Sequence, residues 1–347
     1  MLGAFALGVL LTPVARSFAV RWNVVDHPVG DKIHRVSTPL LGGVAVYLTF
    51  AIASLVLLPL SAPVVGILAG GFVAVAIGIL DEVLTLRPLV HLAGQVAAAL
   101  VGIMAGVGVV ANISDPVSAL TSPGWAVPVW LGLPITVFWI VGMMNTMNFL
   151  DGMDGLAAGV AALTTLVLAV WASEPQRFYI TSTTHLEQVI LPVSLAGALL
   201  AFLVFNWHPA RIFLGDSGSM FLGFSLGALS IVGPAKLGTA LLVLVIPILD
   251  VAWAIVRRRM RGRSFLTGDK QHVYHRMLEL GLSHTTTVLL LYFLCLALAG
   301  MDLLLFKVAK LVAFVLLALV TGTTFVVLEV RATRRNAALV SRQAVGR

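Results

Sequence analysis

The chain has 347 residues, of which 59% are hydrophobic and only 11% are charged, and its mean hydropathy is +1.03. A soluble globular domain carries about 25% charged residues, so this composition excludes an ordinary soluble domain and indicates a polytopic membrane protein. The net charge of +7 does not indicate nucleic-acid binding, because the basic residues follow the predicted loops without interleaved aromatic residues.

Apolar segments of roughly 20 residues recur along the chain and predict transmembrane helices. The sequence predicts eleven of them, at 2–20, 40–59, 63–80, 89–110, 126–144, 156–172, 188–205, 218–233, 237–255, 285–300 and 303–328. The expected fold class is therefore all-α. We expect a single integral membrane domain over residues 1–330, followed by a basic cytoplasmic tail over residues 331–347.

The basic residues predict the orientation of the chain. With the N-terminus outside, 17 of the 22 Lys and Arg residues fall in cytoplasmic loops, and only Arg177 and Lys236 fall in outer loops. An odd number of spans is then required, because one helix more or fewer would move the basic run 256–263 to the wrong side. The C-terminus is accordingly predicted to be cytoplasmic.

Four polar clusters interrupt the apolar chain: 81–82, 145–154, 206–219 and 269–275. All four fall on the predicted cytoplasmic side. Polar and ionisable residues in or beside a membrane usually mark function, and a scattered set would fall on both sides. We therefore expect several loops to build one site.

The first cluster, Asp81-Glu82, ends the third predicted span. Two adjacent carboxylates can bind a divalent cation or a proton, although a solvated helix end would have the same sequence. Negative charge at a helix C-terminus opposes the helix dipole, which favours a functional reading.

The second cluster is more specific. Asn145, Asn148, Asp151 and Asp154 recur every three residues, so they share one face if the segment is helical. Four polar side chains in one stripe at a membrane boundary suit a polar ligand or a hydrated cation. A purely structural loop is the less favoured alternative.

In the third cluster, Gly215-Asp216-Ser217-Gly218 precedes the eighth predicted span. Ser217 or Asp216 is predicted to cap that helix, whose N-terminus would then attract phosphate. Asp216 is alternatively predicted to hold Mg²⁺, which prefers oxygen ligands. Capping without catalysis is the simpler alternative.

The fourth cluster places His272 and His275 three residues apart, on one face of a helix if the segment is helical. They follow an arginine run, 257–263, whose simpler explanation is topology and contact with lipid headgroups. The sequence has neither a Walker phosphate loop nor a metalloprotease-type zinc motif. Oxygen ligands for a metal, a phosphate-binding helix end and a basic loop together indicate phosphoryl transfer at a membrane face.

Five ordered segments resemble the polyprenyl-phosphate N-acetylhexosamine-1-phosphate transferases, of the glycosyltransferase family 4 type. They are Asp26 to Gly43, Asp81-Glu82, Asn145 to Leu156, Phe205 to Ser219 and Asp269 to Arg276. The resemblance implies transfer of a sugar-1-phosphate from a UDP-sugar to undecaprenyl phosphate, with release of UMP. It also implies Mg²⁺ as the cofactor, with Mn²⁺ as an alternative, and an active site on the cytoplasmic face of the bacterial inner membrane. Membrane lipid is the expected surrounding partner, and a homodimer is an open alternative.

The resemblance also implies roles for individual residues. The implied metal ligands are Asp216 and Asp151. The implied catalytic residues are Asp81, Glu82, Asp151, His272 and His275. The implied substrate-binding residues are Lys32, His34, Asn145, Asn148, Asp154, Arg211, Phe213 and Ser217, with Phe213 stacking on the uracil.

Three positions depart from the family pattern, namely Leu41, Glu82 and Tyr274. The form of segment 269–276 and the later Gly281 to His284 resemble the branch that uses UDP-GlcNAc and starts teichoic acid, O-antigen or other surface polymers. The branch that transfers phospho-MurNAc-pentapeptide in peptidoglycan synthesis is the first alternative. A membrane transporter and a catalytically inactive relative are the others.

Overall fold

The computed structural model describes residues 1–27, 37–113, 125–173, 185–233, 236–260, 272–304, 309 and 312–324. Predictions that concern Lys32, His34, Asp269 and the tail 331–347 lie outside these residues.

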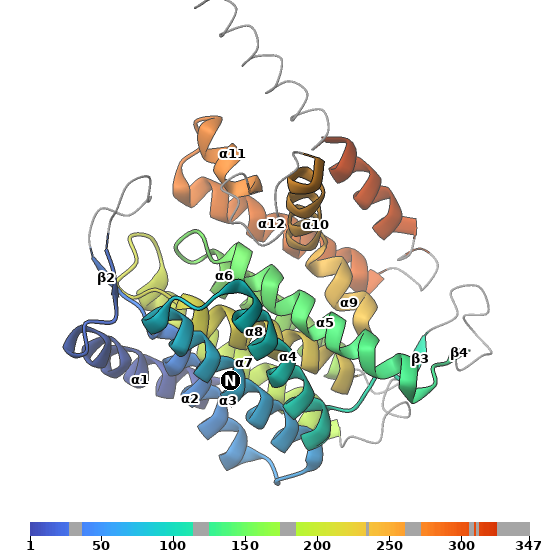
Figure 1. Cartoon of the computed structure of the whole chain (residues 1–347), viewed down its shortest axis with the longest axis horizontal. Helices are drawn as coiled ribbons and strands as arrows, with labels where there is room; N and C mark the ends of the chain where they lie inside the picture. The colour runs from blue at the N-terminus through green and yellow to red at the C-terminus, as the bar shows by residue number, and fades with distance from the viewer. Residues whose placement is uncertain are drawn as a thin grey trace, which may run out of the picture.

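Helices make up most of the described chain (Figure 1). They are α1 (Leu2–Arg21), α2 (Gly42–Leu57), α3 (Ala62–Leu84), α4 (Pro88–Gly102), the π-helix η1 (Ile103–Val107), α5 (Val129–Leu150), α6 (Leu156–Ser173), α7 (His185–Asn206), α8 (Gly215–Val232), α9 (Lys236–Val243), α10 (Val245–Met260), α11 (Val273–Glu279) and α12 (His284–Leu304). Residues Val312–Thr324 form a further helix.

Two short antiparallel strand pairs were not predicted. β1 (Val25–Asp26) pairs with β2 (Thr38–Pro39), and β3 (Asn112–Ile113) pairs with β4 (Trp125–Ala126). Strands of two residues are too short to show the alternating pattern by which a strand is recognised in a sequence. The two pairs lie at opposite sides of the molecule (Figure 1).

The prediction of an all-α polytopic membrane protein is confirmed in its coarse form. Among the described residues, seven helices are long and apolar enough to cross a membrane, or eight if α9 and α10 form one broken span. The number of eleven crossings and the orientation of the termini stay predictions.

The predicted ninth span, 237–255, is bent by 78° between α9 and α10. Pro247 is the physical reason, because proline has no amide hydrogen to donate to the carbonyl of Val243, the last residue of α9. The sequence therefore contained the signal for this break.

Helix α8 is the centre of the packing. From Ser217 to Val232 every residue except Ile231 is buried, and α2, α3 and α5 all pack against this helix. Small residues allow the close approach: a Cβ on Gly218 would lie 2.8 Å from the Cα of Gly43. Small residues at helix contacts are typical of membrane proteins, where van der Waals packing drives association.

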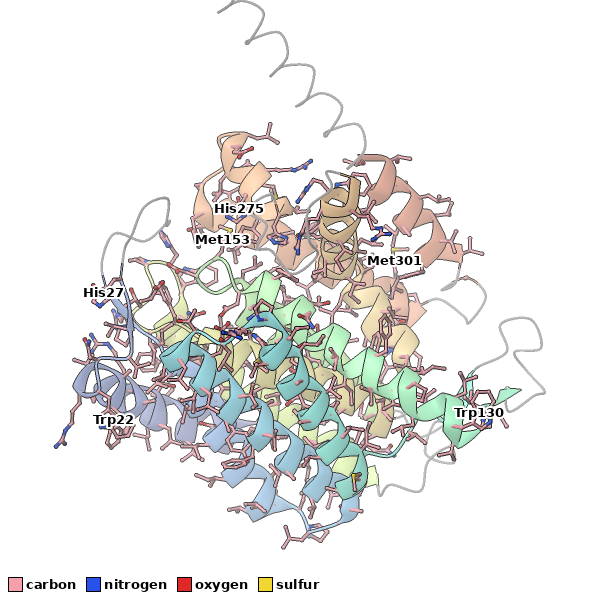
Figure 2. The ribbon with its side chains drawn as sticks, viewed as in Figure 1. Trp22, His27, Trp130, Met153, His275 and Met301 are labelled. Atoms are coloured by element: carbon pink, nitrogen blue, oxygen red, sulfur yellow. The ribbon has the colours of Figure 1, made fainter. Side chains whose placement is uncertain are left out.

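The predicted polar clusters lie toward one end of this bundle. His27, Met153 and His275 are on the same side of the molecule in Figure 2, whereas Trp130 is at the opposite side. The loops that precede α2, α6 and α8, together with α11, therefore face one region.

Candidate functional site

The predicted second and third clusters meet where the end of α5 approaches the start of α8. The amide nitrogen of Asn148 donates to Asp216 Oδ1 at 2.6 Å and lies 3.1 Å from Ser219 Oγ. Glu82, at the end of α3, accepts hydrogen bonds on Oε1 from both the backbone nitrogen and the hydroxyl of Ser217, each at 3.0 Å. Three helices thus bring two predicted clusters and the Asp-Glu pair together.

Glycines make this convergence sterically feasible. A Cβ on Gly43 of α2 would overlap the backbone nitrogen of Gly218, and a Cβ on Gly78 of α3 would overlap the Cα of Ser217. The backbone nitrogen of Gly43 also donates to the carbonyl of Leu214 at 2.9 Å. The first turn of α8 is therefore held directly against the backbones of α2 and α3.

Phe213 is fixed through its backbone. Its nitrogen donates to the carbonyl of Pro39 at 2.8 Å, and its carbonyl accepts from Gly42 at 3.1 Å. The segment before α2, which belongs to the first family-like segment, therefore sets the position of the Phe213 backbone in the third polar cluster.

The prediction that Ser217 or Asp216 caps α8 is wrong. The N-cap residue is Leu214, and no side chain of the helix's own first turn makes a capping bond. Glu82 supplies the cap from α3, because its carboxylate accepts from Ser217 N. A carboxylate in this place also interacts favourably with the positive end of the helix dipole.

Asp151 follows the last residue of α5 and stands among other acids. Burial raises the pKa of Asp151 well above its ordinary value, and the charges of Asp216, Glu82 and Asp154 raise it further, while the Gly215 amide lowers it. Burial likewise raises the pKa of Asp216, which precedes the predicted eighth span. The fold therefore collects carboxylates that repel one another.

A divalent cation would relieve this repulsion. The groups that act on Asp151 include the carboxylates of Asp216, Glu82 and Asp154, and carboxylate oxygens are ligands that Mg²⁺ prefers. The residues present thus fit the cofactor that the family-like motifs imply.

Asp81 contacts His91 of α4 and the backbone of Leu86, whereas its neighbour Glu82 contacts α8. Its Oδ2 lies 2.8 Å from His91 Nδ1, and its Oδ1 accepts from the backbone nitrogen of Leu86 at 2.7 Å. The other ring nitrogen of His91 lies 3.2 Å from Gln95 Nε2, and Gln95 Oε1 accepts from Asn145 at 2.9 Å. Sequence reasoning predicted Asp81 and Asn145 but missed the two α4 residues between them. Two polar residues four apart within an apolar predicted span were the available signal.

Asp154 contacts the loop before α8. Its Oδ2 lies 2.7 Å from His208 Nδ1 and accepts from the backbone nitrogen of Ala210 at 3.1 Å. The ring of His208 stacks on that of His284, with centroids 4.0 Å apart and planes 16° apart.

Asp154, His208 and His284 bring their ligand atoms within 4.8 Å of one another. The stacking nevertheless disfavours a shared metal ion, because imidazole lone pairs lie in the ring plane and two parallel rings cannot both aim at one point. Stacked rings beside one carboxylate are better explained as packing of the loop.

His272 is paired with an acid that the sequence analysis did not select. His272 Nδ1 lies 2.8 Å from Asp250 Oδ2 of α10, and Asp250 Oδ1 accepts from Val273 N at 3.2 Å. The buried His272 ring lies between Phe149, at 5.2 Å, and Tyr274, at 5.8 Å. Asp250 is the only acid within predicted span 237–255, which was the signal for it.

Tyr274, one of the departures from the family pattern, packs against the second cluster. Its hydroxyl fills the space where a Cβ on Gly152 would lie and is 3.5 Å from the carbonyl of Phe149. His275 lies beside it, with ring centroids 4.3 Å apart. The tyrosine thus joins α11 to the loop that carries Asp151.

Two further residues of the third cluster differ in burial and in their contacts. Arg211 is exposed, and its backbone carbonyl accepts from Arg16 Nε at 3.1 Å. Asn206 is buried and was missed as a site-building residue: it accepts from Gly155 N at 3.0 Å and donates to the carbonyl of Ile212 at 2.9 Å. Asn206 therefore ties the second cluster to the third.

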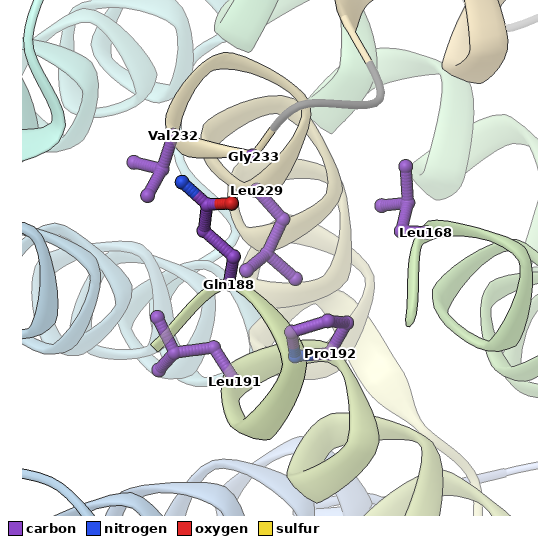
Figure 3. Close-up of a pocket in the computed structure, with 7 residues that line it drawn as sticks. All are labelled: Leu168, Gln188, Leu191, Pro192, Leu229, Val232 and Gly233. Carbon is purple, nitrogen blue, oxygen red and sulfur yellow. The ribbon is translucent and has the colours of Figure 1, made fainter. Parts of the chain in front are cut away.

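Two pockets lie between helices. One is enclosed by α6, α7 and α8 and lined mainly by apolar side chains such as Leu168 and Leu191 (Figure 3). Its only side chain with a polar group is Gln188, so it does not suit a charged ligand. The other lies between α5, α6, α10, α11 and α12, with Asp250 and Tyr274 among otherwise apolar lining residues.

Comparison with known proteins matches residues 64–234 to a family described as glycosyl transferase family 4. A probable undecaprenyl-phosphate N-acetylglucosaminyl 1-phosphate transferase of Bacillus subtilis is 32% identical, over 82% of this chain and 77% of the relative. A decaprenyl-phosphate N-acetylglucosaminephosphotransferase of Mycolicibacterium smegmatis is 36% identical, over 80% and 74%. A phospho-N-acetylmuramoyl-pentapeptide-transferase of Moorella thermoacetica is 32% identical, over 79% and 87%.

Proposed function

The chain belongs to glycosyl transferase family 4, and we propose that within this family it transfers GlcNAc-1-phosphate from UDP-GlcNAc to undecaprenyl phosphate, releasing UMP. The observation that carries this proposal is the convergence of Glu82, Asn148 and Asp216 from three helices beside the loop of Asp151. Such a group of oxygen ligands suits a diphosphate bound through a divalent cation.

In the proposed reaction, an oxygen of the lipid phosphate forms a bond to the phosphorus that carries the sugar. The bond from that phosphorus to the bridging oxygen breaks, and UMP leaves with that oxygen. Asp216 and Asp151 would hold Mg²⁺, which neutralises charge on the diphosphate. Asn148 orients Asp216, and Asp81 binds the lipid phosphate or accepts its proton.

A small, mostly apolar cleft lies between α10, α11 and α12, beside the second cluster. Its apolar lining includes Leu150, Ile246 and Cys295, and Tyr274 at its wall touches Gly152 of the second cluster. We propose that this end of the bundle faces the cytoplasm of a bacterial cell, where UDP-sugars are made.

Sequence identity alone does not select the sugar, because the N-acetylglucosaminyl 1-phosphate transferase of Bacillus subtilis and the phospho-N-acetylmuramoyl-pentapeptide-transferase of Moorella thermoacetica are each 32% identical to the chain. UDP-GlcNAc is favoured by the form of segment 269–276, in which His272 and His275 are separated by two other residues, whereas the pentapeptide branch carries a run of three histidines in this loop. Transfer of phospho-MurNAc-pentapeptide stays the second candidate.

The test is UMP release by the purified protein in lipid nanodiscs. UDP-GlcNAc and UDP-MurNAc-pentapeptide are compared, each with undecaprenyl or decaprenyl phosphate, in Mg²⁺, in Mn²⁺ or in EDTA. We expect release from UDP-GlcNAc that requires both lipid phosphate and a divalent cation. Asp216→Asn, which keeps the side-chain size, should abolish it. Release from the pentapeptide substrate alone would overturn the choice of sugar, and UDP-sugar uptake into liposomes without UMP would overturn the proposed reaction.

A further inference from the structure

A line of hydrogen bonds runs through three helices and ends on Asp81. It begins at the backbone carbonyl of Val141 in α5, which accepts from Asn145 Nδ2 at 2.8 Å. The same amide nitrogen donates to Gln95 Oε1 at 2.9 Å, Gln95 Nε2 lies 3.2 Å from His91 Nε2, and His91 Nδ1 lies 2.8 Å from Asp81 Oδ2.

The Val141 carbonyl sets the direction of every bond in this line. A backbone carbonyl can only accept, so the amide nitrogen of Asn145 must face it. Gln95 then accepts on its oxygen and donates from its nitrogen, so Nε2 of His91 must accept. The proton of a neutral His91 is therefore on Nδ1, where it is donated to Asp81.

Burial makes this arrangement strict. Gln95 is 1% exposed, so its amide has no water with which to replace a lost partner. A proton on Nε2 of His91 would face the amide hydrogens of Gln95, and both groups would lose a hydrogen bond. The line thus favours one protonation state and one tautomer of the ring.

Asp81 is consequently held by donors on both oxygens, His91 on Oδ2 and the Leu86 amide on Oδ1. Two donors, one on each oxygen, fix the rotation of the carboxylate about the side-chain bonds. Asp81 is also close enough to Asp216 for its charge to act on that residue.

We propose that His91 is a positioning residue for the transferase reaction, which holds Asp81 as an oriented carboxylate through an Nδ1 proton that Gln95 and Asn145 keep in place. The proposal rests on the proposed function in one respect, the action of Asp81 on the lipid phosphate. The ring itself need not touch either substrate.

Matched substitutions test the role in turnover. His91→Leu removes the donor and should lower kcat about 10- to 100-fold, the effect typical of groups that orient a functional ligand. KM for UDP-GlcNAc should stay within about twofold, because Asp81 acts on the lipid phosphate. His91→Asn places an amide nitrogen near the former Nδ1 and should restore most of kcat. Both variants lose the hydrogen bond from Gln95 Nε2 to the ring, so both should melt at a lower temperature than the wild type.

Three results would overturn the positioning role. One is full kcat in His91→Leu. Another is a rise in KM for UDP-GlcNAc that accounts for the whole loss of kcat/KM in His91→Leu. The third is a loss of kcat in His91→Asn as large as in His91→Leu.

The tautomer provides a readout that does not depend on turnover. The ¹⁵N spectrum of histidine-labelled protein at neutral pH should contain a neutral, Nδ1-protonated ring that disappears in His91→Asn. Gln95→Leu should change that signal, because it removes the donor to Nε2. An Nε2-protonated or doubly protonated His91 would overturn the hydrogen-bond line even in an active enzyme. Absence of UMP release with the expected spectrum would instead reject the proposed function and leave the line intact.

Discussion

Glu82 contacts a different helix from its neighbour in the Asp-Glu pair. One carboxylate oxygen accepts two hydrogen bonds from Ser217, so this side chain spans from α3 to the first turn of α8. The extra methylene of glutamate, a departure from the family pattern, provides that reach. Its role as a catalytic acid stays a prediction, and its geometry is that of a cap supplied by another helix.

Shortening Glu82 should therefore remove the cap. Glu82→Asp is expected to destabilise the protein by about 1 kcal/mol, as loss of a helix cap does, because the shorter acid cannot reach Ser217. Glu82→Gln keeps an acceptor oxygen at the same distance and should melt close to the wild type. Thermal unfolding in detergent measures both, and equal melting temperatures for Glu82→Asp and wild type would contradict the capping role.

Asp151 is expected to lower the stability of the metal-free protein, although it is proposed to be needed for activity. Its raised pKa means that the folded state holds a proton more tightly than the unfolded chain, whose carboxyl titrates near 3.8. The free energy of unfolding thus falls as pH rises above that value. Asp151→Asn should then melt at a higher temperature than wild type in EDTA at pH 7.

The same substitution should abolish turnover in Mg²⁺, because an amide is a poor substitute for a carboxylate ligand. Added Mg²⁺ should raise the melting temperature of wild type and have little effect on the variant. A lower melting temperature for Asp151→Asn in EDTA would show that Asp151 stabilises the fold rather than straining it.

Among the elements, α8 depends on the absence of side chains in α2 and α3. Gly43 and Gly78 lie against the backbone of its first turn, and any Cβ there would force the helices apart. The predicted site residues Asp216 and Ser217 are in that turn, so a change in the distance between α8 and its neighbours would also move these two residues.

Gly78→Ala should consequently impair both stability and activity. Overpacking a tight contact destabilises by about 1–3 kcal/mol, and separation of α3 from α8 would also displace Glu82 from Ser217. Gly142→Ala in α5 is the matched control, because a Cβ at that position meets nothing within 4 Å. Melting temperature and UMP release should fall only in Gly78→Ala. Tolerance of both alanines would mean that α3 can move without effect on the site.

Several elements were predictable from the sequence because their signal is local. Apolar runs predicted the helices, and Pro247 marked the bend between α9 and α10. The partners across helices were not predictable, since His91 and Asp250 are separated from Asp81 and His272 by turns whose geometry sets the packing. The three-residue spacing of Asn145 and Asn148 predicted a common face, but only the packed helices show that one contacts Gln95 and the other Asp216.

At the scale of the whole molecule, Met153 of the second cluster and His275 of the fourth lie near each other and far from Trp130 (Figure 2), and hydrogen bonds join the second cluster to the third. A permeation path would instead need polar residues distributed across both sides of the membrane. The gathering of these clusters in one region therefore favours the proposed transferase over a transporter. The predicted orientation of that region can be measured directly.

The single cysteine, Cys295, makes a labelling experiment simple. In a Cys295→Ala background, Leu280→Cys and Leu60→Cys introduce one exposed thiol each at opposite predicted faces. A membrane-impermeant maleimide should label Leu280→Cys only in inside-out vesicles and Leu60→Cys only in right-side-out vesicles. Labelling of both from the same side would contradict the predicted topology of spans three to nine.

The burial of α8 has a consequence for how membrane enzymes are recognised. Helix α8 is buried against other helices on every side, so its surface need not be hydrophobic enough to contact lipid. Its serines and glycines instead allow close packing against the neighbouring helices. It accordingly does not pass the length-and-hydropathy criterion that seven other described helices meet. Scanning by hydropathy ranks helices by how well they suit the bilayer, whereas α8 is enclosed by its neighbours. A helix of this kind ranks low even though it carries a predicted site residue, Asp216.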